Sequence, residues 1–473
     1  MTWLGTGVSG RPAMHAAEAP KRQTLNTRSP VLAQVWARWW VTVVVLGLTM
    51  GSDYKVRIRD KTEAISGRPD PLILLEIGIY ALVFALVVAR TRTLRTARTD
   101  ALTALFGCYA GYLAFSSVWS PYRSLALVRA SQLVVVAMLG FVLVRYARSA
   151  HFHRLAHAHL AVVTVSVLYG KLQPAPPVSR IVAGRFTWLS IHPVTSANWT
   201  ALALLFAVAY LLQRGRPARL WPAWLYGPAA VVVGYGLLAS KTRGSVLGFA
   251  VGGVLCLVLG VQRARRTDLL VLGPLALVFA ALTAGSTVVA YAARGENTEQ
   301  LATLNSRTSL WSEAFAAVRA APVAGHGLGA SRGIFQDATG LGGAHNAFIN
   351  VFVDGGAIGV VLWLAVLVGL AARLRTLRRR RPRFALETAV IAGALVLFAV
   401  DSVFMEGLGA AATLPSTWLC VLVSWAAVLS RVPGQVGARA ERDLVPDPGS
   451  DGGTDGGTDG GTDGDHSGGA ARA

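Results

Sequence analysis

The sequence predicts an all-α, polytopic integral membrane protein. Of its 473 residues, 53% are hydrophobic and only 15% are charged, an apolar excess over ordinary soluble domains. The mean hydropathy is +0.49, and apolar runs near the length needed to cross a bilayer recur along the chain. Because backbone polar groups inside a bilayer must be satisfied within the protein, runs of this length are expected to be helices.

The apolar runs predict about twelve transmembrane helices within one membrane domain, residues 35–430. The runs lie at 35–50, 71–89, 101–118, 125–144, 155–170, 193–212, 222–239, 245–261, 269–291, 346–372, 384–404 and 415–430. The longest polar interruption, residues 292–345, is expected to form one large extracytoplasmic loop. Residues 1–34 and the Gly/Asp/Thr-rich residues 431–473 are expected to be disordered cytoplasmic segments.

The distribution of basic residues predicts the orientation. The net charge of +21 comes from arginines clustered in short loops between apolar runs, which is typical of cytoplasmic loops and argues against a nucleic-acid partner. Of the 45 Lys and Arg residues, 29 fall in the alternating loops that include both termini. These loops are therefore assigned to the cytoplasm, with residues 378–381, four consecutive arginines, as the strongest anchor.

The sequence predicts no metal site and no cofactor. The three cysteines all fall inside apolar runs and have no metal-ligand spacing. The four histidines between His151 and His159 have no cysteine or carboxylate beside them in the sequence, so a metal is not expected there. If a site were missed, Asp337 and Asp354 would be the first candidate ligands.

Candidate functional residues gather in the predicted extracytoplasmic loops. His345 stands where the large loop enters an apolar run, where a histidine can accept a proton from a hydroxyl or simply bond a backbone carbonyl. Arg243 and Arg307 also lie at such boundaries. Two guanidinium groups suit a pyrophosphate, while anchoring to lipid headgroups is the alternative. Lys241 and Arg332 are auxiliary candidates from their positions alone.

The residues that follow His345 form a spaced motif. Asn346 comes next, then nine residues, Gly356, two residues and Gly359. This pattern resembles the one around the catalytic histidine of the O-antigen ligase and Wzy-type polymerase superfamily of bacterial envelope glycosyltransferases. Together with Gly355, these glycines also thin one helix face, so that another segment can approach.

Two arginine steps extend the resemblance. Arg243 stands in a Thr-Arg-Gly step after a mid-chain apolar run. Arg307 begins an Arg-x-x-x-Trp step that ends at Trp311 and is followed by Gly325-x-Gly, which by itself is expected to be a flexible turn. A weaker family-like step is the Ile-His-Pro around His192.

The resemblance implies a membrane glycosyltransferase of the bacterial inner (cytoplasmic) membrane. Its donor is a glycan on undecaprenyl pyrophosphate, transferred with inversion to an acceptor hydroxyl without metal or nucleotide. It implies that His345 is the general base, that Arg243 and Arg307 hold the pyrophosphate, and that Asn346 adjoins the substrate. Besides donor and acceptor, the only partners expected are membrane lipids.

The sequence leaves two questions open. A ligase attaches a finished chain to a lipid, wall or protein anchor, whereas a polymerase joins repeat units, and the motif is shared by both. A polyprenyl-linked glycan flippase or a non-catalytic envelope scaffold is the alternative from a different class. A flippase is expected to carry charged residues through several spans, whereas Glu76, Glu387 and Asp401 all lie close to predicted span ends.

The predicted orientation can be tested by labelling. A cysteine placed at Glu299 should react with a membrane-impermeant maleimide in intact cells, because the loop is expected outside. A cysteine placed at Gly461 should react only after the membrane is permeabilised. The reverse pattern of labelling would refute the orientation and, with it, the catalytic role assigned to the large loop.

Overall fold

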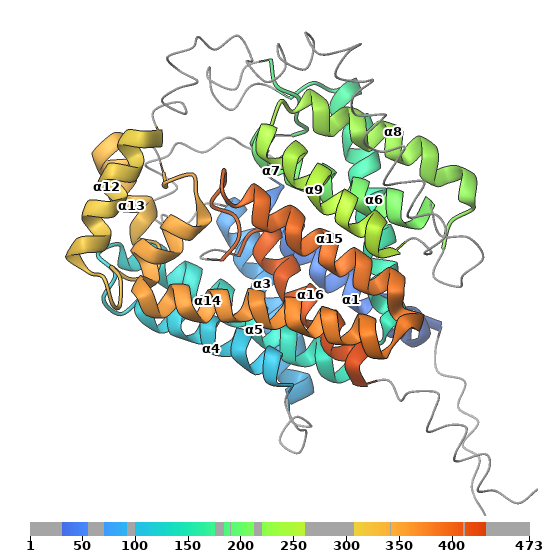
Figure 1. Cartoon of the computed structure of the whole chain (residues 1–473), viewed down its shortest axis with the longest axis horizontal. Coiled ribbons are helices and arrows are strands. Elements are labelled where there is room, and N and C mark those ends of the chain that lie inside the picture. The colour runs from blue at the N-terminus through green and yellow to red at the C-terminus, as the bar shows by residue number, and fades with distance from the viewer. Residues whose placement is uncertain are drawn as a thin grey trace, which may run out of the picture.

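The computed structural model describes residues 31–54, 71–91, 100–175, 184–189, 191–211, 220–260, 307–340, 342–409 and 412–431. These residues form helices and connecting loops, with no strand among them (Figure 1). Eight described helices are long and apolar enough to cross a membrane, and three shorter ones are apolar. The prediction of an all-α polytopic membrane protein is therefore confirmed.

Each predicted apolar run within the described residues corresponds to a helix. The helices are α1 (Val31–Asp53), α3 (Pro71–Thr91), α4 (Ala101–Ser116), α5 (Arg123–Tyr146), α6 (Ser149–Leu172), α7 (Pro193–Leu211), α8 (Ala223–Ala239), α9 (Arg243–Gly260), α12 (Arg307–Ala320), α13 (Ala330–Thr339), α14 (Ala347–Arg380), α15 (Ala385–Asp401) and α16 (Leu414–Arg431). The predicted span 269–291, the residues up to 30 and those from 432 lie outside the described part. The total of twelve spans stays a prediction.

Small residues let the backbones of α9 and α15 come together. A Cβ on Gly248 would lie 2.7 Å from the carbonyl oxygen of Leu397, and one on Gly252 would lie 2.4 Å from that of Gly393. Glycines spaced four apart form one face of a helix, and in a membrane such faces allow close van der Waals packing. This contact fixes the position of Arg243, the first residue of α9, relative to the end of α15.

The arginine-rich helix ends lie together at one end of the bundle. Arg373 of α14 forms an ion pair with Asp100, 3.0 Å away, and its guanidinium also donates to Ser430. Arg431, the last residue of α16, donates to the carbonyl of Val144 at the end of α5. The contiguous arginines at the end of α14 also sit where the helix dipole favours positive charge.

The long helix α14 is broken by a kink at Gly356, whose φ of 60° and ψ of −162° are not helical. In an uninterrupted helix, the N–H groups of residues 357 and 358 would bond the carbonyls of residues 353 and 354. Instead, Ala357 donates to Pro322 and Ile358 to Val323, at 2.9 and 3.2 Å. The carbonyls of residues 353 and 354 accept from His326 and Gly327, at 2.8 and 2.9 Å.

The loop of residues 321–329 therefore replaces the hydrogen bonds that the kink breaks. A Cβ on Gly325 would lie 2.5 Å from the Asp354 carbonyl oxygen and from the Gly356 nitrogen. The expectation of a flexible Gly325-x-Gly turn is wrong, because the backbone of this turn is hydrogen-bonded to α14. The other expectation, that glycines allow another segment to approach the helix, is confirmed at Gly356.

The two helices of the large loop, α12 and α13, pack on the first turns of α14 at one end of the molecule (Figure 1). Their contact has its own small apolar core, separate from that of the bundle, formed by Ala314, Val318, Phe335, Ala344 and Val353. The described part of the loop is therefore a folded cap over the start of α14.

The close packing at the kink predicts how glycine substitutions change the stability of the protein. Gly325→Ala should lower the thermal unfolding midpoint in detergent, because the residue has a φ of +69° and no space for a Cβ. Gly340→Ala is the matched control, because its φ of +71° is equally unfavourable but no atom lies within 4 Å of an added Cβ. The control should cost about 1–2 kcal/mol, and Gly325→Ala clearly more. Equal losses would show that the close approach at the kink contributes nothing.

Candidate functional site

His345 lies at a strained and firmly held point just before α14. Its φ is +50°, an uncommon conformation for a residue other than glycine, and its side chain is half-buried. The next residue, Asn346, caps α14 by accepting from the Ile349 N–H at 3.1 Å. The preceding carbonyl, that of Ala344, accepts from the indole of Trp311 on α12 at 3.2 Å. Such backbone strain is typical of functional sites and persists only where neighbouring contacts impose it.

The turn after α15 holds His345 from the other side. Ala347 donates its N–H to the Ser402 carbonyl at 2.9 Å, and the Asn346 side chain donates to the Val403 carbonyl at 3.2 Å. Both polar atoms of the Asn346 side chain therefore have partners within the protein. These contacts give Asn346 a structural role, and its predicted contact with substrate stays a prediction.

The same turn also touches the start of α9. An added Cβ on Gly244 would lie 3.0 Å from Asp401 Oδ1 and 3.0 Å from Phe404. Ser245 donates its hydroxyl to the buried Asp401 at 2.9 Å. Arg243 and His345 therefore flank one turn, residues 401–404, although they are a hundred residues apart in the sequence.

The segment before α7 completes this group. Arg185 donates to the Ser240 carbonyl at 2.8 Å and to the Thr242 hydroxyl at 2.7 Å, and so fixes the turn that carries Lys241 and Arg243. Lys241 is exposed and also has a positive φ, of 50°. Desolvation of the His192 ring, together with the positive charges of the nearby Arg185 and His345, lowers the pKa of His192 to about 4. His192, Arg185 and His345 are thus close enough to interact electrostatically.

The cap positions the remaining predicted arginines. Arg332 is half-buried on α13 and packs beside Gly342, three residues before His345. Arg307 is the first residue of α12, one turn before Trp311, which bonds the residue next to His345. The side chain of Arg307 lies outside the described part, so its role stays a prediction.

Asp354 and Asp337, the carboxylates considered first as metal ligands, both have hydrogen-bond partners within the protein. Buried Asp354 accepts from the Gly329 and Ser331 N–H groups at 3.0 and 2.6 Å, and so caps α13. Asp337 accepts a short hydrogen bond from Tyr122. Within the described residues, no three His, Cys, Asp or Glu side chains are grouped as metal ligands.

The histidines of α6 lie away from this site, inside the bundle. His153 bonds Tyr210 at 2.8 Å and Glu387 at 3.2 Å, and His157 bonds Tyr226 at 2.6 Å. The sequence places no carboxylate beside them, yet the fold brings Glu387 to His153. Each of these two histidines therefore bonds a side chain of another helix.

One carboxylate at the site was missed from the sequence. Glu406 is half-buried and accepts from the Asn350 amide at 2.9 Å. Its side chain also packs directly against Gly343, which has a φ of +128° and no room for a Cβ. Asn350 in turn accepts from the Ala344 N–H at 3.0 Å, so it joins Glu406 to the segment that carries His345. Only the tertiary fold brings these residues together.

The fold and these contacts define a polytopic α-helical membrane protein with cationic and histidine side chains gathered at one end. Residues 228–364 match the model of the O-antigen ligase family, and this match supports the O-antigen ligase/Wzy-type superfamily for the chain. The matched segment runs from α8 to the middle of α14 and includes the predicted arginines, Lys241, His345 and Asn346, whereas His192 lies outside it. No curated protein matches the chain.

The link through Asn350 yields a prediction. Asn350→Ala should leave the Ala344 N–H and the Glu406 carboxylate without this partner, and an unsatisfied buried group costs about 1–3 kcal/mol. The unfolding midpoint in detergent should fall accordingly. Gln336→Ala is the control, because the buried oxygen of this α13 side chain has no hydrogen-bond partner, and it should have little effect. A similar small effect for Asn350→Ala would show that the link does not hold the segment.

Proposed function

We propose that this protein transfers a glycan from undecaprenyl pyrophosphate to an acceptor hydroxyl at the extracytoplasmic face of the bacterial inner membrane. The family match supports an O-antigen ligase- or polymerase-like function in general. The observation that supports the more specific proposal is that the neighbours of Arg243 and His345, Gly244 and Ala347, both contact the turn of residues 401–404. This arrangement combines an anion-binding group with a proton acceptor in one place.

The donor is proposed to bind through its pyrophosphate. Arg243 begins α9 and His345 immediately precedes the capping residue of α14, so both stand at helix N-termini, where the helix dipole favours anions. Guanidinium groups add bidentate hydrogen bonds to phosphate oxygens. Arg307, Lys241 and Arg332 are the further cations proposed to contact the donor.

In the proposed reaction, the acceptor oxygen attacks C1 of the donor sugar from the side opposite the pyrophosphate. The new C1–O bond forms as the old one breaks, with inversion, and undecaprenyl pyrophosphate leaves with the bonding electrons. A ring nitrogen of His345 takes the proton of the acceptor hydroxyl, a role worth about 10²–10⁴ in rate. The arginines stabilise the charge that develops on the leaving pyrophosphate. No metal enters this scheme.

The acceptor is proposed to lie near Glu406. Carboxylate oxygens accept hydrogen bonds from sugar hydroxyls, and Glu406 is held by Asn350 beside the segment that leads to His345. A ligase and a polymerase both need such an acceptor site. They differ in the molecule that enters it.

The proposed activity is tested with purified protein. The protein is incubated in EDTA with a defined undecaprenyl-pyrophosphate glycan and candidate acceptors, and the size of the products is measured. A ladder of products identifies a polymerase, and a single addition identifies a ligase.

In the same assay, His345→Ala should lower turnover by about 10²–10⁴-fold with little change in donor affinity, because a general base acts mainly in the transition state.

The arginine variants should show the opposite pattern. Arg243→Lys and Arg307→Lys keep the charge but lose the bidentate geometry, so donor affinity should fall by about 10- to 100-fold. Arg319→Lys, on the exposed last turn of α12, is the control and should behave as the wild type. Wild-type turnover by His345→Ala across pH 6–8 would refute the mechanism.

A further inference from the structure

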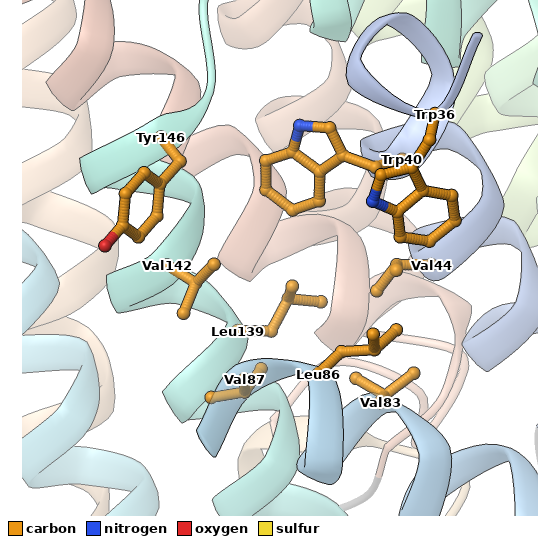
Figure 2. Close-up of a pocket in the computed structure, with 9 residues that line it drawn as sticks. All are labelled: Trp36, Trp40, Val44, Val83, Leu86, Val87, Leu139, Val142 and Tyr146. Atoms are coloured by element: carbon orange, nitrogen blue, oxygen red, sulfur yellow. The ribbon is translucent and has the colours of Figure 1, made fainter. Parts of the chain in front are cut away.

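A crevice opens between α1, α3 and α5 on the arginine-rich side of the bundle (Figure 2). It is lined by Trp36, Trp40, Val44, Val83, Leu86, Val87, Leu139, Val142 and Tyr146. Apart from the indole N–H groups and one hydroxyl, these side chains are apolar. The three aromatic residues lie closest to the helix ends, where tryptophan and tyrosine sit at a membrane–water interface.

The crevice lies within membrane-spanning helices, so hydrocarbon chains rather than water surround its opening. An apolar hollow in this position can accept an acyl chain, which gains the contacts that the helices leave unmade. Among the described helices, α3 packs mainly along α1 and α5, and it exposes Leu74, Leu75, Ile77, Leu82 and Phe84. A chain in the crevice would tie α3 to its neighbours.

The two tryptophans of the aromatic rim have indole N–H groups available to a ligand. Neither Trp36 nor Trp40 makes an indole hydrogen bond within the described part of the chain. Both rings lie beside the crevice in Figure 2, and Trp40 also packs edge-on against His151, with ring centroids 6.1 Å apart. An indole N–H at this depth is a suitable donor to the ester or phosphate oxygens of a lipid.

Positive charge gathers around the same rim. Arg145 and Arg148 flank the crevice residue Tyr146 in the sequence, and both are exposed. The first turn of α6 brings a third arginine, since Arg154 donates to the Arg38 carbonyl of α1 at 3.3 Å. His151, also in that turn, bonds the adjacent α1 carbonyl at 3.0 Å.

The described acidic residues on this side do not neutralise that charge. Asp100 is paired with Arg373, and Glu387 bonds His153. Basic pockets between transmembrane helices at this level bind anionic headgroups. A neutral lipid would fill the apolar hollow equally well but would bring no anionic headgroup to the arginines.

We infer that this crevice is a binding site for an anionic glycerophospholipid of the leaflet that borders the arginine-rich end. One acyl chain enters between α1, α3 and α5, and the phosphate lies among Arg145, Arg148 and the two indole groups. The site is distinct from the one around His345, which lies at the opposite end of the helices. Its role is structural: the lipid holds α3 against the bundle.

The test measures thermal unfolding of delipidated full-length protein in detergent, with phosphatidylglycerol or phosphatidylcholine of identical acyl chains added. Phosphatidylglycerol should raise the midpoint by at least roughly 2–4 °C more than phosphatidylcholine. Arg145→Gln with Arg148→Gln should remove this difference. Arg375→Gln with Arg379→Gln, exposed arginines of α14 at the same end, should retain it.

A second variant tests the acyl chain. Leu139→Trp should fill the crevice and abolish the response to both lipids without lowering the lipid-free midpoint. Val83→Phe serves the same purpose if the first variant does not fold. Equal effects of the two lipids on the wild type, or equal losses in both arginine pairs, would overturn the inference. So would displacement of phosphatidylglycerol by undecaprenyl phosphate, since the occupant would then be a polyprenyl chain.

Discussion

The exchange of hydrogen bonds at the Gly356 kink determines the arrangement around the site. A break in a membrane helix leaves backbone N–H and carbonyl groups that cannot form hydrogen bonds with water. Such a break is stable only where other protein groups supply those hydrogen bonds. Here four such groups are satisfied by residues 322–327, each through the backbone. The exchange requires glycine on both sides and allows Asp354 to cap α13. The kink and the cap therefore depend on each other.

The kink also explains why His345 can lie where it does. It separates a short first segment of α14, residues 347–355, from the long membrane-spanning part. The residues on both sides of His345 are fixed: Ala344 bonds Trp311 of α12 and Asn350 of this first segment, and Ala347 bonds the turn after α15. These contacts can impose the positive φ of His345, which the residue would not adopt alone.

Much of the fold could be predicted because the bilayer restricts the choice. Apolar length fixes the helices, and arginine clusters indicate which ends lie together, so most predicted boundaries agree with the structure within a few residues. The expectation that another segment approaches the glycines after His345 also agrees with the structure at Gly356. What the sequence could not supply were contacts between distant polar residues, such as Glu406 with Asn350 or Arg185 with the turn before Arg243. These depend on loop geometry, for which hydrophobic periodicity carries no information.

The turn of residues 401–404 connects the two parts of the candidate site, the start of α9 with Arg243 and the start of α14 with His345. It follows α15, which is locked to α9 by glycine contacts, and it bonds the start of α14 through backbone groups. A shift of α9 along α15 would therefore change the distance between Arg243 and His345. Because the backbones of the two helices are in direct contact at Gly248 and Gly252, such a shift is costly. Under the mechanism we propose, this packing would hold the anion-binding Arg243 and the proton acceptor His345 at a fixed separation, as catalysis by positioned groups requires.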